Sequence, residues 1–480
     1  MFVLWLATLL SLSPILGGLT SPQEASLVFF VAVLSLGIET SRRIWNDNFP
    51  IPPLPLLGWA AFLSLVSFLS AFLSPIPAQA FIAWRSLVLG LWIIPLLTLF
   101  SPSLRARIDQ ALFFSAYLLC AYAAVQIFLF RHLEVASFFP NANIFAAFIA
   151  LLLPLAWEQK RVFLAACLTL MLLATKSVGA WLSLSTAALI LQKEMPRKIK
   201  FFAFLVLILC LALIVQKPAF DFQNRWTWWQ AAFHAISKSP WLGIGPGVLT
   251  YIIPIEVAGH SLRSIYAHQF YLQTAAECGM IYLIFFLAGI FLILPQSPMK
   301  RLAIVAALFL GFWDYSLSVP AIFFIFCYLA ASEISPSLKS TPMNNFRFPL
   351  ALLILILTAI VVKPAWARWN EERLKAEGIS LFNRHAPIAE VRQKFLQSLL
   401  WAPDADVERL VAEIDFRAYQ EKSPDSQLEL SSAIRHWEKA SQENPCRASN
   451  WKALSSLEQI SGNYAEAQRD SMKALHLPCP

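Results

Sequence analysis

The sequence predicts an all-α membrane protein: a polytopic bundle of about 12–13 transmembrane helices, with a large external loop and a C-terminal α-helical tail. Hydrophobic residues make up 58% of the 480 residues, the mean hydropathy is +0.61, and only 14% of residues are charged. Soluble domains are about half apolar and a quarter charged. The apolar excess lies in long runs separated by short basic segments, which is typical of a multi-pass membrane protein.

Thirteen apolar runs are candidate spans. A helix needs about 20 apolar residues to cross a bilayer, so the shortest runs could instead hold irregular backbone covered by protein. The first run has no basic start and no clear small-residue cleavage site, so we interpret it as a retained span rather than a signal peptide. The candidates are 2–18, 23–40, 54–74, 79–100, 108–130, 142–157, 161–174, 177–192, 199–216, 270–294, 301–314, 317–335 and 347–363.

Basic residues predict which side of the membrane each loop faces. Lys and Arg are enriched in cytoplasmic loops, so we expect a cytoplasmic N-terminus, with the 217–269 loop and everything after Lys363 outside. Residues 301–335 have basic flanks on both sides, so an even number of crossings is expected there, with Asp314 in an external turn. One alternating set of loops has 14 basic residues: Arg42, Arg43, Arg105, Arg107, Lys160, Arg161, Lys193, Arg197, Lys198, Lys200, Lys300, Arg301, Lys339 and Arg347. The other short loops hold only Arg131 and Lys176.

The composition changes after the last span, which divides the chain into a transmembrane domain, 1–363, and a soluble tail, 364–480. The tail resembles one well-matched and one degenerate tetratricopeptide repeat. Fewer than three repeats rarely stand alone, so we expect an irregular helical array that could dock a protein partner; a generic helical tail is the alternative. The matching residues are Trp437, Ala440 and Pro445 in the first frame, and Trp451, Leu454, Gly462, Ala467 and Ala474 in the second.

Two of the seven cysteines, Cys446 and Cys479, bracket the better repeat. If the tail lies outside, both thiols meet an oxidising compartment. A bridge between them would stabilise the tail by roughly 3–4 kcal/mol in the chain-entropy model, and two free thiols are the alternative. The other five lie in or beside apolar runs without metal-ligand spacing, and we interpret them as small buried apolar residues.

The loop at 217–269 carries the residues best suited to catalysis. Arg225 has a permanently charged guanidinium that binds phosphate through two N–H groups. His268 has an imidazole that titrates near neutral pH and can take a proton from a hydroxyl. Because His268 directly precedes the apolar run that begins near Phe270, it is expected at the membrane surface. The pair suits attack of an alcohol on a sugar carried by a lipid diphosphate; the alternative is that both side chains only extend to the water interface.

Two further arginines are candidates for binding the diphosphate. Arg263 lies five residues before His268, where a solvated loop charge is the alternative. Arg85 lies inside an apolar run, near its external end. An intramembrane arginine is by default a functional candidate, and a side chain that merely extends to the interface is the alternative.

Other patterns in the same loop have structural explanations. Its tryptophans, Trp226, Trp228, Trp229 and Trp241, could form a sugar-stacking surface or an interfacial aromatic belt. The glycines of residues 243–247 follow no strand, so a tight turn is favoured over a dinucleotide site. No carboxylate cluster is visible, so we predict no metal and no cofactor. The net charge of +8 follows from the orienting loops and does not predict nucleic-acid binding.

Several motifs together resemble the O-antigen ligase/polymerase superfamily. They are Arg225 to Trp229; Pro240-x-Leu242-Gly243-x-Gly245-x-Gly247; His268-x-x-x-Leu272; Glu277-x-Gly279; and Phe139-Pro140-Asn141-Ala142-Asn143, similar to the family's Asn-Pro-Asn loop. The resemblance covers about 1–335. In it Arg225 matches the family's loop arginine and His268 its essential histidine, with Arg263 a match for a second arginine.

The resemblance implies a bundle of around twelve helices with a large periplasmic loop, in the bacterial inner membrane. It also implies transfer of a glycan from undecaprenyl diphosphate to lipid A-core, to another glycan or to a protein hydroxyl. The sequence departs from the family twice. Gln269 stands where the family usually has asparagine, and Val178 replaces the arginine of a Ser-Arg-Gly motif, which leaves the mode of substrate binding open.

Three classes of function stay open at the level of sequence. The first is a metal-independent glycan transferase, as ligase, polymerase or protein O-oligosaccharyltransferase. The second is a solute transporter, which predicts polar residues buried at mid-membrane in broken helices, whereas the polar residues here gather in the external loop. The third is a scaffold that recruits partners through its tail, for which Arg225 and His268 would have no common role.

The basic asymmetry predicts that the tail lies outside the cytoplasm. Alkaline phosphatase fused after Pro480 should therefore be active, because it folds only after export. A fluorescent protein that folds only in the cytoplasm should stay dark at the same position. The reverse pattern would remove one span from the predicted topology.

Overall fold

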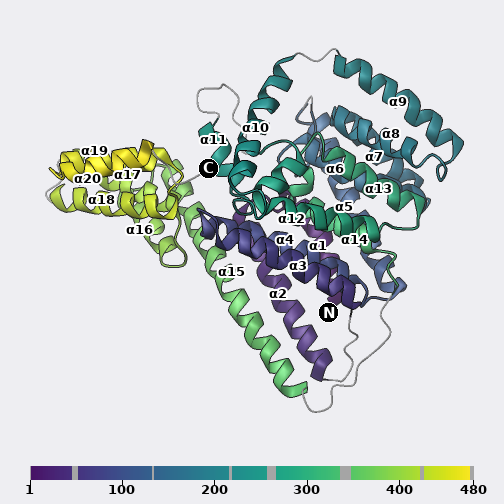
Figure 1. The fold of residues 1–480 in the computed structure, drawn as a ribbon, viewed down its shortest axis with the longest axis horizontal. Helices are drawn as coiled ribbons and strands as arrows, with labels where there is room; N and C mark the ends of the chain where they lie inside the picture. The colour runs from purple at the N-terminus through teal and green to yellow at the C-terminus, as the bar shows by residue number, and fades with distance from the viewer. Residues whose placement is uncertain are drawn as a thin grey trace.

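The computed structural model describes residues 2–45, 52–131, 134–215, 219–256, 266–335, 347–421 and 426–475. Within these ranges all regular secondary structure is helical, so the predicted all-α fold is confirmed. Figure 1 shows a bundle formed by α1 to α14, the long helix α15 beside α2, and the tail helices α16 to α20 at the end of α15.

The helices of the bundle are α1 (Phe2–Ile15), α2 (Pro22–Trp45), α3 (Leu54–Phe72), α4 (Pro77–Leu97), α5 (Pro102–Phe128), α6 (Ala142–Glu158), α7 (Val162–Ala174), α8 (Val178–Ile190), α9 (Arg197–Val215), α10 (Ala219–Lys238), α11 (Leu249–Glu256), α12 (Phe270–Leu292), α13 (Pro298–Leu310) and α14 (Pro320–Ala331), with short 3₁₀ turns at Gly17–Leu19 and Ser316–Ser318. Then follow α15 (Arg347–Asn383), α16 (Ile388–Leu399), α17 (Ala405–Gln420), α18 (Ser426–Glu443), α19 (Ala448–Ile460) and α20 (Tyr464–Leu475).

Each of the thirteen candidate spans corresponds to a helix, but these helices differ in length. Among the described residues, six are long and apolar enough to cross a membrane: those at Gln23–Arg42, Leu54–Phe72, Pro77–Leu97, Pro102–Phe128, Phe270–Leu292 and Ala351–Asn383. Five further apolar helices have only 10–17 residues. A helix of 12 residues, such as α14, is about 18 Å long at 1.5 Å per residue, which is shorter than the hydrocarbon core of a bilayer.

Two of the shorter helices, α6 and α14, are covered by other parts of the protein. Every residue of α14 from Ala321 to Ala331 is buried, and most of α6 is buried as well. The long helix α2, by contrast, has only a third of its apolar window buried. A helix surrounded by other helices does not need to match the bilayer thickness, because its ends are covered by neighbouring chain segments.

In the described part of the chain, several connections of the basic set are joined by polar contacts. Arg105 donates hydrogen bonds to the carbonyl oxygens of Leu97 and Ser332, both at 2.8 Å. On the same set of connections, Arg301 forms an ion pair with Glu194 at 2.5 Å. These contacts join the loops after α4, α8, α12 and α14.

Connections of the other set are joined by polar contacts as well. The Ser70 hydroxyl donates to the carbonyl oxygen of Glu277 at 2.7 Å. The Asn141 amide donates to the Tyr315 hydroxyl at 2.9 Å. These contacts join the end of α3 to α12, and the loop after α5 to the loop after α13.

The external loop is anchored to a break in α12. Gly279 has φ +83° and ψ 167° inside this helix, a backbone conformation that interrupts its hydrogen bonding. The loop pairs with the exposed backbone, because the N–H of Ile244 donates to Ala276 and that of Gly245 to Glu277, both at 2.9 Å. The glycine string is therefore a turn that docks on α12, as the sequence indicated.

The Glu277 side chain also connects the external loop to α12. Its carboxylate accepts hydrogen bonds from the backbone N–H groups of Gly247 and Leu249, the latter being the first residue of α11. It also accepts one from the Gln273 amide at 2.5 Å. The buried carboxylate thus ties the loop to the outer turn of α12.

The tail packs against the external loop. Helix α15 runs without interruption through Pro364, so the last span continues into the tail as one helix. Cys446 lies in the same apolar cluster as Trp228 and Ile252 of the loop. Burial, and next the nearby carboxylate of Asp406, raise the pKa of Tyr251 to about 12. The loop and the tail therefore lie on the same face.

Within the tail, the residues predicted from the repeat frames form the core. Trp437, Trp451 and Leu454 are buried in one cluster. Gly462 adopts φ +86° in the turn between α19 and α20, where a turn was predicted. Cys446 is disulfide-bonded, whereas the five cysteines of the bundle are free. Its predicted partner, Cys479, lies outside the described residues.

Replacing Gly279 with alanine should destabilise the fold. The added Cβ would lie 2.0 Å from the Trp241 carbonyl oxygen, in a backbone conformation that only glycine adopts easily. We expect a loss of at least roughly 3 kcal/mol, measured as a lower thermal midpoint in detergent. Gly58→Ala is the control, because its Cβ would meet nothing within 4 Å. Equal midpoints for the two variants would contradict the docking described above.

Candidate active site at the 313–315 turn

The start of α12 fixes the position of His268. Gln269 caps the helix, with its side-chain oxygen accepting the N–H of Leu272 at 2.5 Å. His268 therefore stands just before the first turn, and its φ is +50°. This left-handed conformation is uncommon for a residue other than glycine and occurs often at functional sites.

The ring of His268 is held between two aromatic side chains. It stacks on Trp228 at a centroid distance of 4.8 Å and an interplanar angle of 29°. It meets Tyr315 edge to face at 5.1 Å and 88°. Two contacts at nearly perpendicular planes fix the orientation of the imidazole.

Tyr315 connects this ring to two other parts of the bundle. Its own ring stacks on Tyr266 at 3.9 Å. Its hydroxyl accepts the hydrogen bond from Asn141, which also caps α6 by accepting the N–H of Ile144 at 3.0 Å. Burial, and next the charge of Asp314, raise the pKa of Tyr315, so the phenol stays protonated at neutral pH.

Arg225 reaches the same turn from α10. Its Nη1 donates to the carbonyl oxygen of Trp313 at 2.6 Å. Because His268 contacts Tyr315, two positions further on, the turn at Trp313, Asp314 and Tyr315 brings together the two residues predicted to be catalytic. We call these three residues the 313–315 turn.

A cavity of about 260 Å³ adjoins this arrangement. Tyr266 and Phe270, on either side of His268, line it. Polar groups of α4 and α12, including Gln79 and Gln273, form part of its wall, and Phe323 part of its apolar side. Its volume is slightly below the usual range for small-molecule sites, so it could hold part of a larger substrate.

Arg263 and Arg85 are the other predicted site residues. Arg263 is outside the described residues. Arg85 lines a second cavity, together with residues of α2, α15 and the tail, and it does not line the cavity beside His268. Trp228 is buried against His268, whereas Trp226 and Trp241 are exposed and remain available as stacking surfaces.

Two residues depart from the family motifs, Gln269 and Val178. The structure gives Gln269 a role and shows where Val178 lies. Gln269 caps α12 through its side-chain oxygen, as an asparagine could. Val178 begins α8, and a Cβ on the adjacent Gly179 would lie 3.9 Å from the Cβ of Trp313. The segment that lacks the family's arginine therefore lies beside the turn that Arg225 contacts.

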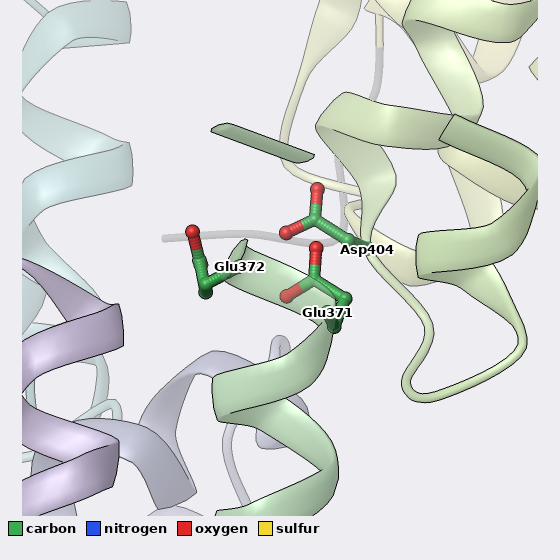
Figure 2. Close-up of side chains that lie close together, drawn as sticks. All are labelled: Glu371, Glu372 and Asp404. Carbon is green, nitrogen blue, oxygen red and sulfur yellow. The ribbon is translucent and has the colours of Figure 1, made fainter. Parts of the chain in front are cut away.

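Sequence reasoning missed one carboxylate cluster. Figure 2 shows Glu371 and Glu372 of α15 close to Asp404, which precedes α17, with ligand atoms within 4.8 Å of one another. Asp404 accepts from Arg368 at 2.9 Å and from Lys375 at 3.1 Å. Since two cations already contact these oxygens, the cluster is an ion-pair network that joins the last span to the tail.

Comparison with known proteins places one part of the chain. Residues 163–287 match a protein-family model described as O-Antigen ligase. The match includes Arg225, His268, the glycine string and the break in α12. No curated protein matches the chain. The superfamily resemblance is confirmed over these residues, while the repeat character of the tail stays a prediction.

Asn141→Ala should lower the stability of the outer half of the bundle. The change removes the cap of α6 and the hydrogen bond to Tyr315. Loss of a cap costs about 1 kcal/mol and loss of the second bond a similar amount, measured by thermal unfolding in detergent. Asn143→Ala, two residues further on, is the matched control, and a drop of equal size in both variants would contradict the role given to Asn141.

Proposed function

We propose, from the match of residues 163–287 to a family model described as O-Antigen ligase, that the protein transfers a glycan from undecaprenyl diphosphate to an acceptor hydroxyl. The reaction takes place at the periplasmic face of the bacterial inner membrane. Lipid A-core or a related surface glycan is the proposed acceptor.

His268 is the proposed general base. Its imidazole takes the proton of the acceptor hydroxyl as the oxygen attacks the anomeric carbon of the sugar. A carbon–oxygen bond to the acceptor forms, and the bond between the anomeric carbon and the diphosphate oxygen breaks. The electron pair stays on the diphosphate, and Arg225 neutralises the charge that develops there.

The convergence of Arg225 and His268 on the 313–315 turn carries this proposal. Arg225 lies in α10 and His268 just before α12, so the two come from different parts of the chain. Trp228 and Tyr315 hold the imidazole in one orientation. Less conformational entropy is therefore lost when the ring is positioned for the reaction. The adjoining cavity, with Gln79 and Gln273 in its wall, gives a place for a sugar unit.

The proposed side of the membrane is argued from the distribution of basic residues. Most of the basic residues between the spans lie in one alternating set of connections, and the 313–315 turn lies in the other. Because basic loops are retained in the cytoplasm, the turn and the tail belong outside. A disulfide at Cys446 agrees with an oxidising compartment for the tail.

The break in α12 at Gly279 is the feature that most favours a transporter. It is filled by the backbone of the external loop, and Glu277 is used to bind that loop. The break therefore has a structural role, and the transferase is the better supported function. A polymerase and a protein O-oligosaccharyltransferase use the same chemistry and are distinguished only by the acceptor.

Profiling of cell-surface glycans in a deletion strain would decide between these acceptors. Loss of polymer from lipid A-core, with accumulation of lipid-linked polymer, would identify a ligase. Shortening to single repeat units would identify a polymerase. Unchanged surface glycans and glycoproteins would contradict the proposed function.

Arg225→Ala and His268→Ala should each lower glycan transfer by at least about 10²-fold, because each removes a group that acts in the transition state. Arg225→Lys should also be poor, since an ammonium cannot bind phosphate with two parallel N–H groups. The assay is transfer from lipid-linked glycan in membranes that contain equal amounts of each variant. His234→Ala and Arg131→Ala, both exposed, are the controls, and near-normal transfer in either test variant would exclude its catalytic role.

Glycan transfer should persist in the presence of a chelator. The proposed chemistry uses one base and one cation, both supplied by side chains, and needs no Lewis acid. Activity would be compared before and after dialysis against EDTA. A strict requirement for a divalent ion, restored when the ion is added back, would show that a metal takes part.

A further inference from the structure

A second cavity, of about 490 Å³, lies where the bundle meets the tail. Helices α2, α4 and α15 form three of its walls, and the segment 401–403 before α17 forms the fourth. It adjoins the first cavity, since Ile82 of α4 lines both. On α4, however, Ala83 and Ser86 line the first cavity, whereas Trp84 and Arg85 line the second.

Two guanidinium groups line this second cavity, and each has a buried N–H without a hydrogen-bond partner in the described part of the chain. The atoms are Nη1 of Arg85 and Nε of Arg368. Arg368 is only 6% exposed and is fixed by a hydrogen bond to the carbonyl oxygen of Pro403 at 3.1 Å. A buried charged donor left unpaired is costly, so the pair indicates that an anion belongs here.

The neighbouring acidic residues do not occupy this position. Glu371, Glu372 and Asp404 contact Arg368, but none of the three lines the cavity. Their negative charge compensates Arg368 and Lys375 on the side of the tail. Arg85 has no such partner: its described contact is with the ring of Phe29, whose centroid lies 5.9 Å away.

The remaining walls are apolar. They include the aromatic rings of Phe29, Phe81, Trp84 and Trp401 and the aliphatic side chains of Ile82 and Val361. A free inorganic anion would gain nothing from these rings. An amphiphile with a phosphate head and hydrocarbon chains would satisfy the two arginines and cover the apolar walls at once.

We propose that this cavity binds the phosphate group of a membrane phospholipid, with Arg85 and Arg368 as the phosphate-binding residues and the aromatic rings against its acyl chains. The bound lipid would lie between the last span and the tail, and would join the two. The inference does not rest on the proposed function, because apart from Ile82 the residues that line this second cavity line no part of the first one.

Lipid binding to the full chain, purified in detergent, tests this inference without an assay of transfer. Native mass spectrometry would give the apparent Kd for phosphatidylglycerol, for diacylglycerol with the same acyl chains, and for inorganic phosphate alone. We expect phosphatidylglycerol to bind at least about tenfold more tightly than diacylglycerol, since only the former offers a charged acceptor to the arginines. Inorganic phosphate should neither bind with comparable affinity nor displace the lipid.

Three variants locate the binding. Arg85→Gln should weaken phosphatidylglycerol binding by at least about tenfold. Ala367→Trp keeps both arginines and fills the cavity, so it should also prevent lipid binding. If Arg85→Gln does not fold, this second variant decides the outcome. Arg161→Gln is the matched control, because that guanidinium also lies over a phenylalanine ring but lines neither cavity.

Several results would overturn the proposal. Equal affinity for phosphatidylglycerol and diacylglycerol would mean that the phosphate is not recognised. Wild-type affinity in Ala367→Trp, or in folded Arg85→Gln, would place the lipid elsewhere. Full competition by inorganic phosphate would make a free anion, and not a lipid, the ligand.

Discussion

The docking of the external loop on the broken helix α12 is the interaction on which the outer half of the molecule depends. Gly279 interrupts the helix, and the backbone groups exposed there pair with the loop at Ile244 and Gly245. The buried carboxylate of Glu277 binds the start of α11. An unpaired backbone group at membrane depth is expensive, so the loop and the helix need each other. The contact between the loop and α12 therefore fixes the positions of both ends of the loop, which carry Arg225 and His268.

The bundle combines long, partly exposed helices with two shorter enclosed ones, α6 and α14. The long helices carry much of the exposed apolar surface, whereas α6 and α14 are almost entirely enclosed. Enclosed helices can be shorter than the bilayer, and their ends then leave room for turns below the membrane surface. The 313–315 turn lies at the end of another short helix, α13.

The tail is joined to the bundle by charge and by apolar packing. Arg368 and Lys375 bridge α15 to Asp404, and Cys446 packs against the external loop. Breaking such a buried ion pair is costly because it leaves a charge without its partner. The tail is therefore fixed on the face of the 313–315 turn, and a protein or lipid bound by the tail would lie close to the proposed site.

The sequence by itself determined the helical class, because hydrophobic periodicity is a local property of the chain. It also predicted the alternation of the loops from their basic residues and pointed to Arg225 and His268 as candidate site residues. It also indicated that the glycine string is a turn, but not that this turn fills a break in another helix. Tyr315 and the cluster around Asp404 had no local signal: each depends on residues that are far apart in the sequence and that only packing brings into contact. The neighbours of Arg85 also had no local signal, because in the sequence it is an isolated arginine in an apolar run. Tertiary structure decided its neighbours, because the face of α4 on which it lies is set by α2, α15 and the tail.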